Sequence, residues 1–138
     1  MRRVLALCVC LLLFTACYKP YVGRKLNYYT DYWCRCETLP AKCKIGGGKD
    51  QFTFEFTVDK IGEEYCIEGA AHWPEASGMI TIKEISASII LANDKTVTDY
   101  IPFGIFAKDL REPLPFKKTF KTEKFDAVTI NYRMWIHD

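Results

Sequence analysis

Alternating apolar and polar residues dominate the chain after residue 50. In residues 52–58 the even positions are apolar and the odd positions polar, which predicts a half-buried β-strand. In residues 65–72 the inward face falls on the odd positions, so we expect Cys66 to lie on the outer face of that strand. Residues 128–136 alternate in the same way and predict a long final strand. Further short strands are predicted over residues 79–91, 97–107 and 116–120.

Two of these strands carry a break in the pattern. Within residues 79–91 the apolar positions change from even to odd, which indicates either a β-bulge near Lys83 and Glu84 or a bend between two strands. Within residues 97–107, Pro102 and Gly104 predict an interrupted strand. The predicted strand at residues 116–120 contains Lys117 and Lys118, and lysines are typical of a strand at the edge of a sheet.

The predicted fold class is therefore all-β. About six to eight short strands separated by turns, with no helical period beyond the first segment of the chain, favour an antiparallel β-sandwich over residues 50–138. A chain of 138 residues with 49% hydrophobic and 26% charged residues fits one such domain. The same composition argues against a disordered chain or a multidomain enzyme.

The first residues form a different kind of segment. Arg2 and Arg3 precede an apolar run over residues 4–14, and the run is followed by Thr15, Ala16 and Cys17. A positive start followed by a short apolar stretch is the architecture of a signal peptide. The stretch is shorter than the roughly 20 residues that a membrane-spanning helix needs. We therefore expect residues 1–16 to be a helical signal peptide that is cleaved from the mature protein.

Residues 13–17, with the sequence Leu-Phe-Thr-Ala-Cys, resemble the lipobox of bacterial lipoproteins, in which a small residue precedes the modified cysteine. The sequence departs from the usual lipobox at Phe14, where leucine is common. The resemblance implies that Cys17 receives fatty acyl chains such as palmitate and holds the protein at a membrane of the bacterial cell envelope. It also implies the outer membrane, facing the periplasm, if the cell is Gram-negative, because Tyr18 rather than aspartate follows the cysteine. The resemblance covers the signal and its cysteine only.

Residues 17–49 are basic and aromatic. Between positions 18 and 49 the chain has 7 lysines and arginines against 2 acidic residues, and its tyrosines and Trp33 crowd into the first half of this stretch. This composition suits either a tether along the membrane surface that leads into a disulfide-pinned flap, or an N-terminal strand that belongs to the core. Without residues 1–16 the chain has 17 basic and 17 acidic residues, and this neutral balance argues against nucleic acid as a partner.

Four cysteines follow Cys17, and export to an oxidising compartment predicts that they form disulfides. A bond between Cys34 and Cys36 is sterically disfavoured, because Arg35 alone separates the two residues. Two pairings stay open, namely Cys34–Cys43 with Cys36–Cys66, or Cys36–Cys43 with Cys34–Cys66. Either one would fasten the segment from 34 to 43 to the strand that holds Cys66. The alternative is a metal or redox site built from the same four cysteines, whose spacing matches neither a zinc ribbon nor a haem attachment motif.

The sequence indicates a binding protein rather than an enzyme, with no catalytic residues, cofactor or metal assigned. On the outer side of the final strand, Arg133, Trp135 and His137 would project together, in the composition of an interface anchor, unless another layer of the protein covers that face. The predicted function is a non-catalytic, membrane-anchored envelope lipoprotein that binds a protein, glycan or lipid partner. The alternative is a lipid-anchored periplasmic enzyme that acts on cell-wall substrates.

Overall fold

The computed structural model describes residues 21–27, 29, 32–46, 52–73, 81–106 and 111–137, and for residues 81–84 and 135–137 it describes the backbone. The predicted signal peptide and Cys17 lie outside the described residues, as do the side chains of Trp135 and His137. The predictions that concern them stay predictions.

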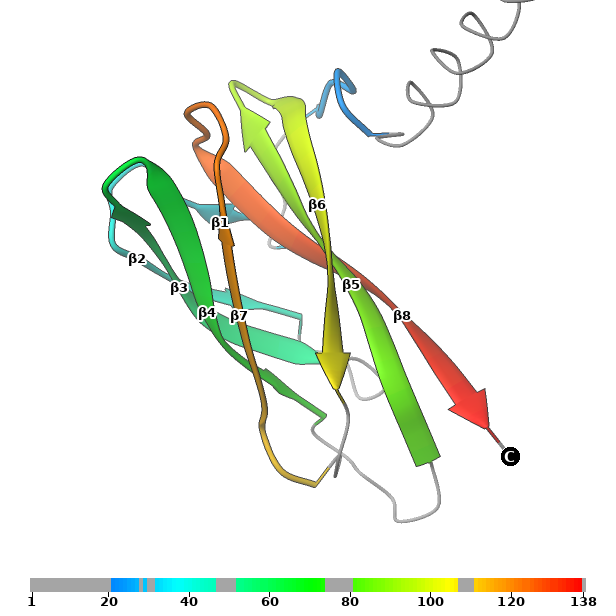
Figure 1. Cartoon of the computed structure of the whole chain (residues 1–138). Coiled ribbons are helices and arrows are strands. Elements are labelled where there is room, and N and C mark those ends of the chain that lie inside the picture. The colour runs from blue at the N-terminus through cyan, green and yellow to red at the C-terminus, as the bar shows by residue number, and fades with distance from the viewer. Residues whose placement is uncertain are drawn as a thin grey trace, which may run out of the picture.

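The described residues form eight antiparallel strands in two sheets of four strands (Figure 1). Sheet A has the order β1-β8-β5-β6, and sheet B has the order β2-β3-β4-β7. This arrangement confirms the predicted all-β antiparallel sandwich. The strands are β1 (Cys34–Arg35), β2 (Ala41–Ile45), β3 (Thr53–Ile61), β4 (Glu64–His72), β5 (Thr81–Asn93), β6 (Thr96–Phe106), β7 (Leu114–Phe120) and β8 (Ala127–His137).

The hairpin of β3 and β4 forms the centre of sheet B, because both strands alternate as the sequence predicts. Phe54, Phe56 and Val58 of β3 point into the core and are at most 4% exposed. Ile67 of β4 pairs with Val58 and is fully buried. Gly62, with a φ of 64°, takes the first position of the two-residue turn between the strands, where an L side chain would be strained.

Gly69 lies between two core aromatic residues. It pairs with Phe56 on β3 and with Phe116 on β7, and the centroids of these two rings are 6.2 Å apart. A Cβ atom at Gly69 would overlap the carbonyl oxygen of Glu55 and would lie 2.5 Å from the Cα atom of Phe56. Sheet B therefore has room for glycine alone at this position.

Sheet A contains both of the strands with a broken pattern. β5 is one strand whose register against β8 shifts between Ile82 and Ile85, which confirms the predicted irregularity and shows that it is not a bend between two strands. β6 runs without interruption through Pro102 and Gly104, so the predicted break there is wrong. The physical reason is the position of β6 beside β5 at the end of the sheet order, because an outer strand tolerates a residue without an N–H group.

Aromatic side chains join the two sheets. Tyr132 of β8 contacts Phe54 of β3 with ring centroids 5.5 Å apart, and Phe103 of β6 contacts Phe116 of β7 at the same distance. Such pairs stabilise a core beyond the apolar area that they bury. Together with the buried aliphatic residues, these contacts make up the core between the two sheets.

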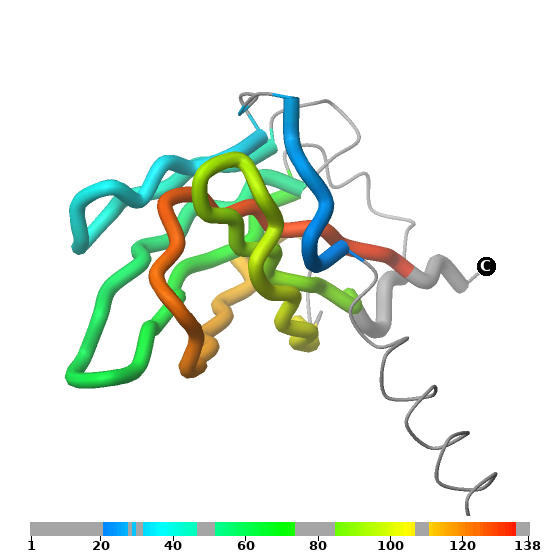
Figure 2. The backbone as a smooth tube through the Cα atoms, turned by 90° about the horizontal axis from the view of Figure 1, so that it is seen from above, coloured from blue at the N-terminus to red at the C-terminus, as the bar shows by residue number. Residues whose placement is uncertain are grey.

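The described part of residues 17–49 belongs to the sandwich. β1 pairs with β8 in sheet A, and β2 pairs with β3 in sheet B. Ahead of them, the segment around Gly23 runs along the β5–β6 hairpin (Figure 2), where the N–H of Gly23 donates to the carbonyl of Val97 and the N–H of Val97 donates to the carbonyl of Arg24, at 2.8 and 2.9 Å. The strands β1 and β2 of this region thus pair with the sheets, whereas its described aromatic residues precede β1 and are not members of the core cluster.

Candidate functional site

A groove of about 580 Å³ lies on the outer face of sheet A. Its floor consists of small residues, because Ser86 and Ser88 stand on β5 and Gly104 stands on β6. Ser86 pairs with Gly104 on one side and with Arg133 on the other. The serines and the glycine leave the sheet surface hollow between larger side chains, and the volume lies in the range of small-molecule sites.

Tyr21 and Tyr100 border the groove, which Tyr132 also lines. The rings of Tyr21 and Tyr100 lie with their centroids 5.7 Å apart and their planes inclined by 30°. The hydroxyl groups of Tyr100 and Ser88 form a hydrogen bond of 2.6 Å, which fixes the orientation of the Tyr100 ring beside the floor. Tyr21 reaches the groove because its neighbours Gly23 and Arg24 are hydrogen bonded to β6. The site thus combines residues of three strands with one from the N-terminal segment.

Asn131 and Arg133 supply the polar groups of β8. Both side chains are exposed, and both line the groove. Among the lining residues whose side chains the structure describes, Arg133 is the charged one, and it brings a guanidinium group to the groove. The sequence singled out Arg133 together with Trp135 and His137, and the structure places Arg133 at the groove. It does not describe the other two side chains.

A second hollow, of about 550 Å³, lies on the outer face of sheet B. Two of its charged side chains are paired with each other, since Lys44 contacts Glu55 at 3.0 Å. The hydrogen bond and the positive charge of Lys44 lower the pKa of Glu55, so this carboxylate is ionised at neutral pH. Glu68 is paired in the same way with Lys117 at 3.5 Å. The described acidic residues of this lining are therefore paired with lysines, and Lys42 adds a further positive charge to this face.

The disulfide between Cys34 and Cys43 connects the two sheets. Cys34 is paired with Val128 in sheet A, and Cys43 is paired with Phe56 in sheet B. Their Cα atoms are 5.6 Å apart. This bond was one of the pairings that the sequence left open, and it closes one edge of the sandwich.

The predicted second disulfide is not formed, because Cys36 and Cys66 are both buried free cysteines. Cys36 packs inside the sandwich as a member of the core, whereas Cys66 stands between the inward-pointing Tyr65 and Ile67 and therefore faces outward. The two thiols lie on opposite faces of sheet B and cannot meet. The segment from 34 to 43 is fastened between the two sheets instead of to the strand of Cys66.

The sulfur atoms of Cys34, Cys36 and Cys43 lie within 4.8 Å of one another. Reduced, three such thiols are donors for a thiophilic metal ion, but in this structure two of them are bonded to each other. Burial, and secondarily the negative charge of Asp126, raise the pKa of the Cys36 thiol to about 11. Cys36 is therefore protonated at neutral pH and is a weak nucleophile toward external reagents.

Alkylation measures this protection directly. We expect iodoacetamide at pH 8 to modify Cys36 at least ~100-fold more slowly in the folded protein than in denaturant, because the pKa rises from 9.0 to about 11 and only the thiolate reacts. Peptide mass spectrometry of timed, acid-quenched samples gives the two rates. Equal rates would mean that the thiol is exposed.

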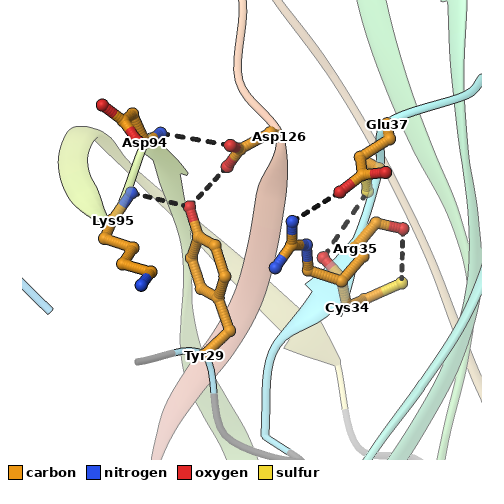
Figure 3. A network of polar contacts seen from close by, with 8 residues as sticks. Tyr29, Cys34, Arg35, Glu37, Asp94, Lys95 and Asp126 are labelled. Carbon is orange, nitrogen blue, oxygen red and sulfur yellow. Dashed lines mark hydrogen bonds and ion pairs between the residues drawn. The ribbon is translucent and has the colours of Figure 1, made fainter. Parts of the chain in front are cut away.

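Tyr29 connects the N-terminal segment to the end of sheet A (Figure 3). Its hydroxyl group donates to a carboxylate oxygen of Asp126 at 2.5 Å and accepts the N–H of Lys95 at 2.8 Å. The other oxygen of Asp126 accepts the N–H of Asp94 at 3.1 Å. Partial burial, and then the hydrogen bond to Asp126, raise the pKa of Tyr29, so the hydroxyl keeps its proton. The guanidinium group of Arg35 lies 4.4 Å from the ring centroid.

Replacing Tyr29 with phenylalanine tests this connection. The change leaves the ring but removes a donor to a carboxylate and an acceptor for a backbone N–H group, so we expect the free energy of unfolding to fall by about 1–2 kcal/mol. Denaturant unfolding measures this loss. Unchanged stability of Tyr29→Phe would contradict this role of the hydroxyl group.

Comparison of the chain with known protein families, with curated proteins and with solved structures finds no match. Among the described residues, no helix has the length and apolar character needed to cross a membrane. The case for function therefore depends on the residues of the groove and on the sequence of the N-terminal segment.

Proposed function

We propose that this protein is a non-catalytic, membrane-anchored envelope lipoprotein whose β-sandwich binds a glycan that carries carboxylate groups. The observation that carries the proposal is the groove of sheet A, in which the described lining brings aromatic rings, hydroxyl groups, the amide of Asn131 and the guanidinium group of Arg133 around a floor of small residues. Of the protein, glycan and lipid partners that the sequence left open, this chemistry favours the glycan.

The residues of the groove suit the parts of an acidic sugar. Tyrosine rings offer flat apolar surfaces for the C–H faces of sugar rings. The hydroxyl group of Ser86 and the amide group of Asn131 can form hydrogen bonds with sugar hydroxyls. The fork of N–H donors on Arg133 matches a carboxylate in a bidentate geometry.

Isothermal titration of the full-length protein, purified from membranes in detergent, tests the ligand class. We expect a uronic acid oligosaccharide to bind and a neutral oligosaccharide of equal length to bind at least ~10-fold more weakly, since charge-assisted hydrogen bonds contribute about 1.5–3 kcal/mol. Arg133→Ala should weaken the binding of the acidic sugar by at least the same factor. Lys42→Ala, which removes a positive charge from the opposite face, is the control.

Two results would contradict this binding function. Equal affinity of wild type and Arg133→Ala would place the ligand elsewhere, and no binding of either sugar would remove the glycan proposal.

The anchor is tested separately by the intact mass of the protein isolated from bacterial membranes. We expect loss of residues 1–16 and an acyl increment on Cys17, both abolished by Cys17→Ser, whereas an unmodified mass would remove the lipoprotein assignment.

A further inference from the structure

Cys36 places a free thiol beside a disulfide. Its sulfur atom lies within 4.8 Å of both sulfur atoms of the Cys34–Cys43 bond. Cys36 and Cys43 are 4% and 6% exposed, while Cys34 is half-buried. A buried thiol at this distance from a disulfide is the arrangement from which thiol–disulfide exchange proceeds.

The backbone holds the three cysteines in this arrangement. Cys34 pairs with Val128 of β8, and the N–H of Cys36 donates to the carbonyl of Asp126 at 2.8 Å. Cys43 stands at the centre of β2, opposite Phe56. Because each cysteine is fixed to a different paired strand or strand end, the sulfur atoms stay close without a movement of the sheets. This proximity offsets the small fraction of Cys36 that is ionised.

We propose that Cys34, Cys36 and Cys43 form one thiol–disulfide exchange site, in which Cys43 is the sulfur shared by two alternative disulfides. Cys36 gives its proton to solvent, and its thiolate attacks the Sγ atom of Cys43. The Cys36–Cys43 bond forms as the Cys34–Cys43 bond breaks, and the departing electron pair stays on the sulfur of Cys34, which takes up a proton from solvent. The step is an isomerisation with no net oxidation or reduction.

Attack on Cys43 rather than on Cys34 follows from the chain geometry. Attack on Cys34 would join residues that are two apart in the chain, and in an extended segment their Cα atoms are about 6.6 Å apart, near the upper limit for a disulfide. Attack on Cys43 produces a second bond from the same β2 residue to the chain that follows β1. The two sheets therefore stay connected in both forms.

The exchange changes which thiol is accessible. Before it, the free thiol is buried at Cys36; after it, the free thiol is on the half-buried Cys34. That thiol can attack a low-molecular-weight disulfide, forming a mixed disulfide at Cys34 and releasing the other half of the reagent as a thiolate. Cys34 is thus a modification site that is available only after exchange.

Trypsin separates the three cysteines, because Arg35 stands between Cys34 and Cys36, and Lys42 and Lys44 flank Cys43. The full-length protein is incubated with oxidised glutathione at pH 8.5, quenched in acid, denatured, alkylated and digested. We expect Cys43 linked to both the Cys34 and the Cys36 peptide, with glutathione attached at Cys34. Cys43 linked to Cys34 alone, without glutathione at Cys34, would overturn the proposal.

Two variants isolate the step. Cys36→Ser removes the attacking thiol, so we expect the Cys34–Cys43 bond to persist and glutathione to be absent from Cys34. Cys34→Ser should yield a Cys36–Cys43 bond when the protein is oxidised with glutathione, and free thiols at both of these positions would overturn the proposal. If Cys34→Ser does not fold, the peptide map of the wild type decides the question.

Discussion

Replacing Gly69 with valine is expected to destabilise the protein by about 3 kcal/mol or more. The Cβ atom alone would overlap the carbonyl oxygen of Glu55, and this neighbour is backbone in the middle of a paired strand. The side chain would also have to share space with the Phe56 and Phe116 rings. To make room, β3 and β4 would have to separate or the aromatic pair would have to leave its position. Guanidinium unfolding measures the change.

Ala70→Val is the matched control for this substitution. Ala70 is the next residue of β4, points to the opposite face of sheet B and is half-buried. Because β-branched residues suit strands, we expect its effect to stay within about 0.5–1 kcal/mol. Similar losses in both variants would show that added bulk anywhere on β4 is harmful, which would contradict the specific role of Gly69.

Removal of the inter-sheet disulfide through Cys43→Ala is expected to cost about 3 kcal/mol, mostly because the unfolded chain loses its cross-link. The cross-link spans a sequence separation of 9 residues, so the loop that it closes is short. Unfolding in guanidinium without reductant measures the loss. A reductant should lower the stability of the wild type by a similar amount and leave that of Cys43→Ala unchanged.

The variant Cys34→Ala distinguishes a simple bridge from a shared one. If Cys43 can pair with Cys36, as we propose, Cys34→Ala keeps a bond between the sheets and loses clearly less stability than Cys43→Ala. Equal losses in the two variants would mean that Cys36 does not replace Cys34. Cys66→Ala serves as a control, since Cys66 is a free cysteine outside this cluster.

The strands of the sandwich could be predicted where one face is apolar over many residues. Residues 52–58 and 65–72 alternate cleanly, and both became central strands of sheet B. The phase change within residues 79–91 also located the irregularity of β5. Pro102 misled the prediction, because a sequence does not reveal that β6 has a neighbouring strand on one side only in the sheet order.

β2 was missed although its sequence, Ala-Lys-Cys-Lys-Ile, alternates as a strand should. The pattern is short, and the surrounding cysteines favoured a flap held by disulfides. The periodicity of residues 65–72 predicted the outward orientation of the Cys66 side chain. It did not predict the disulfide partners, because these depend on the path of the segment from 34 to 43. That segment enters the space between the sheets.

The candidate groove could be predicted only in part. The outward position of Arg133 could be predicted, because the alternation of residues 128–136 places it on the polar face of a long strand. Ser86, Gly104 and Tyr100 join it through the register of β5, β6 and β8, and no local pattern specifies that register. Tyr21 reaches the groove through backbone hydrogen bonds of its neighbours to Val97, which the aromatic composition of this segment does not reveal.

If Cys17 carries the proposed acyl chains, the docking of the N-terminal segment limits how far the sandwich can lie from the membrane. Only residues 18–20 then separate the lipidated cysteine from Tyr21, whose neighbours Gly23 and Arg24 are hydrogen bonded to β6. Fully extended, the step from Cys17 to Tyr21 covers at most about 14 Å. The groove bordered by Tyr21 would therefore work at headgroup height, where it meets sugars that are themselves attached to the membrane before it meets any that diffuse freely.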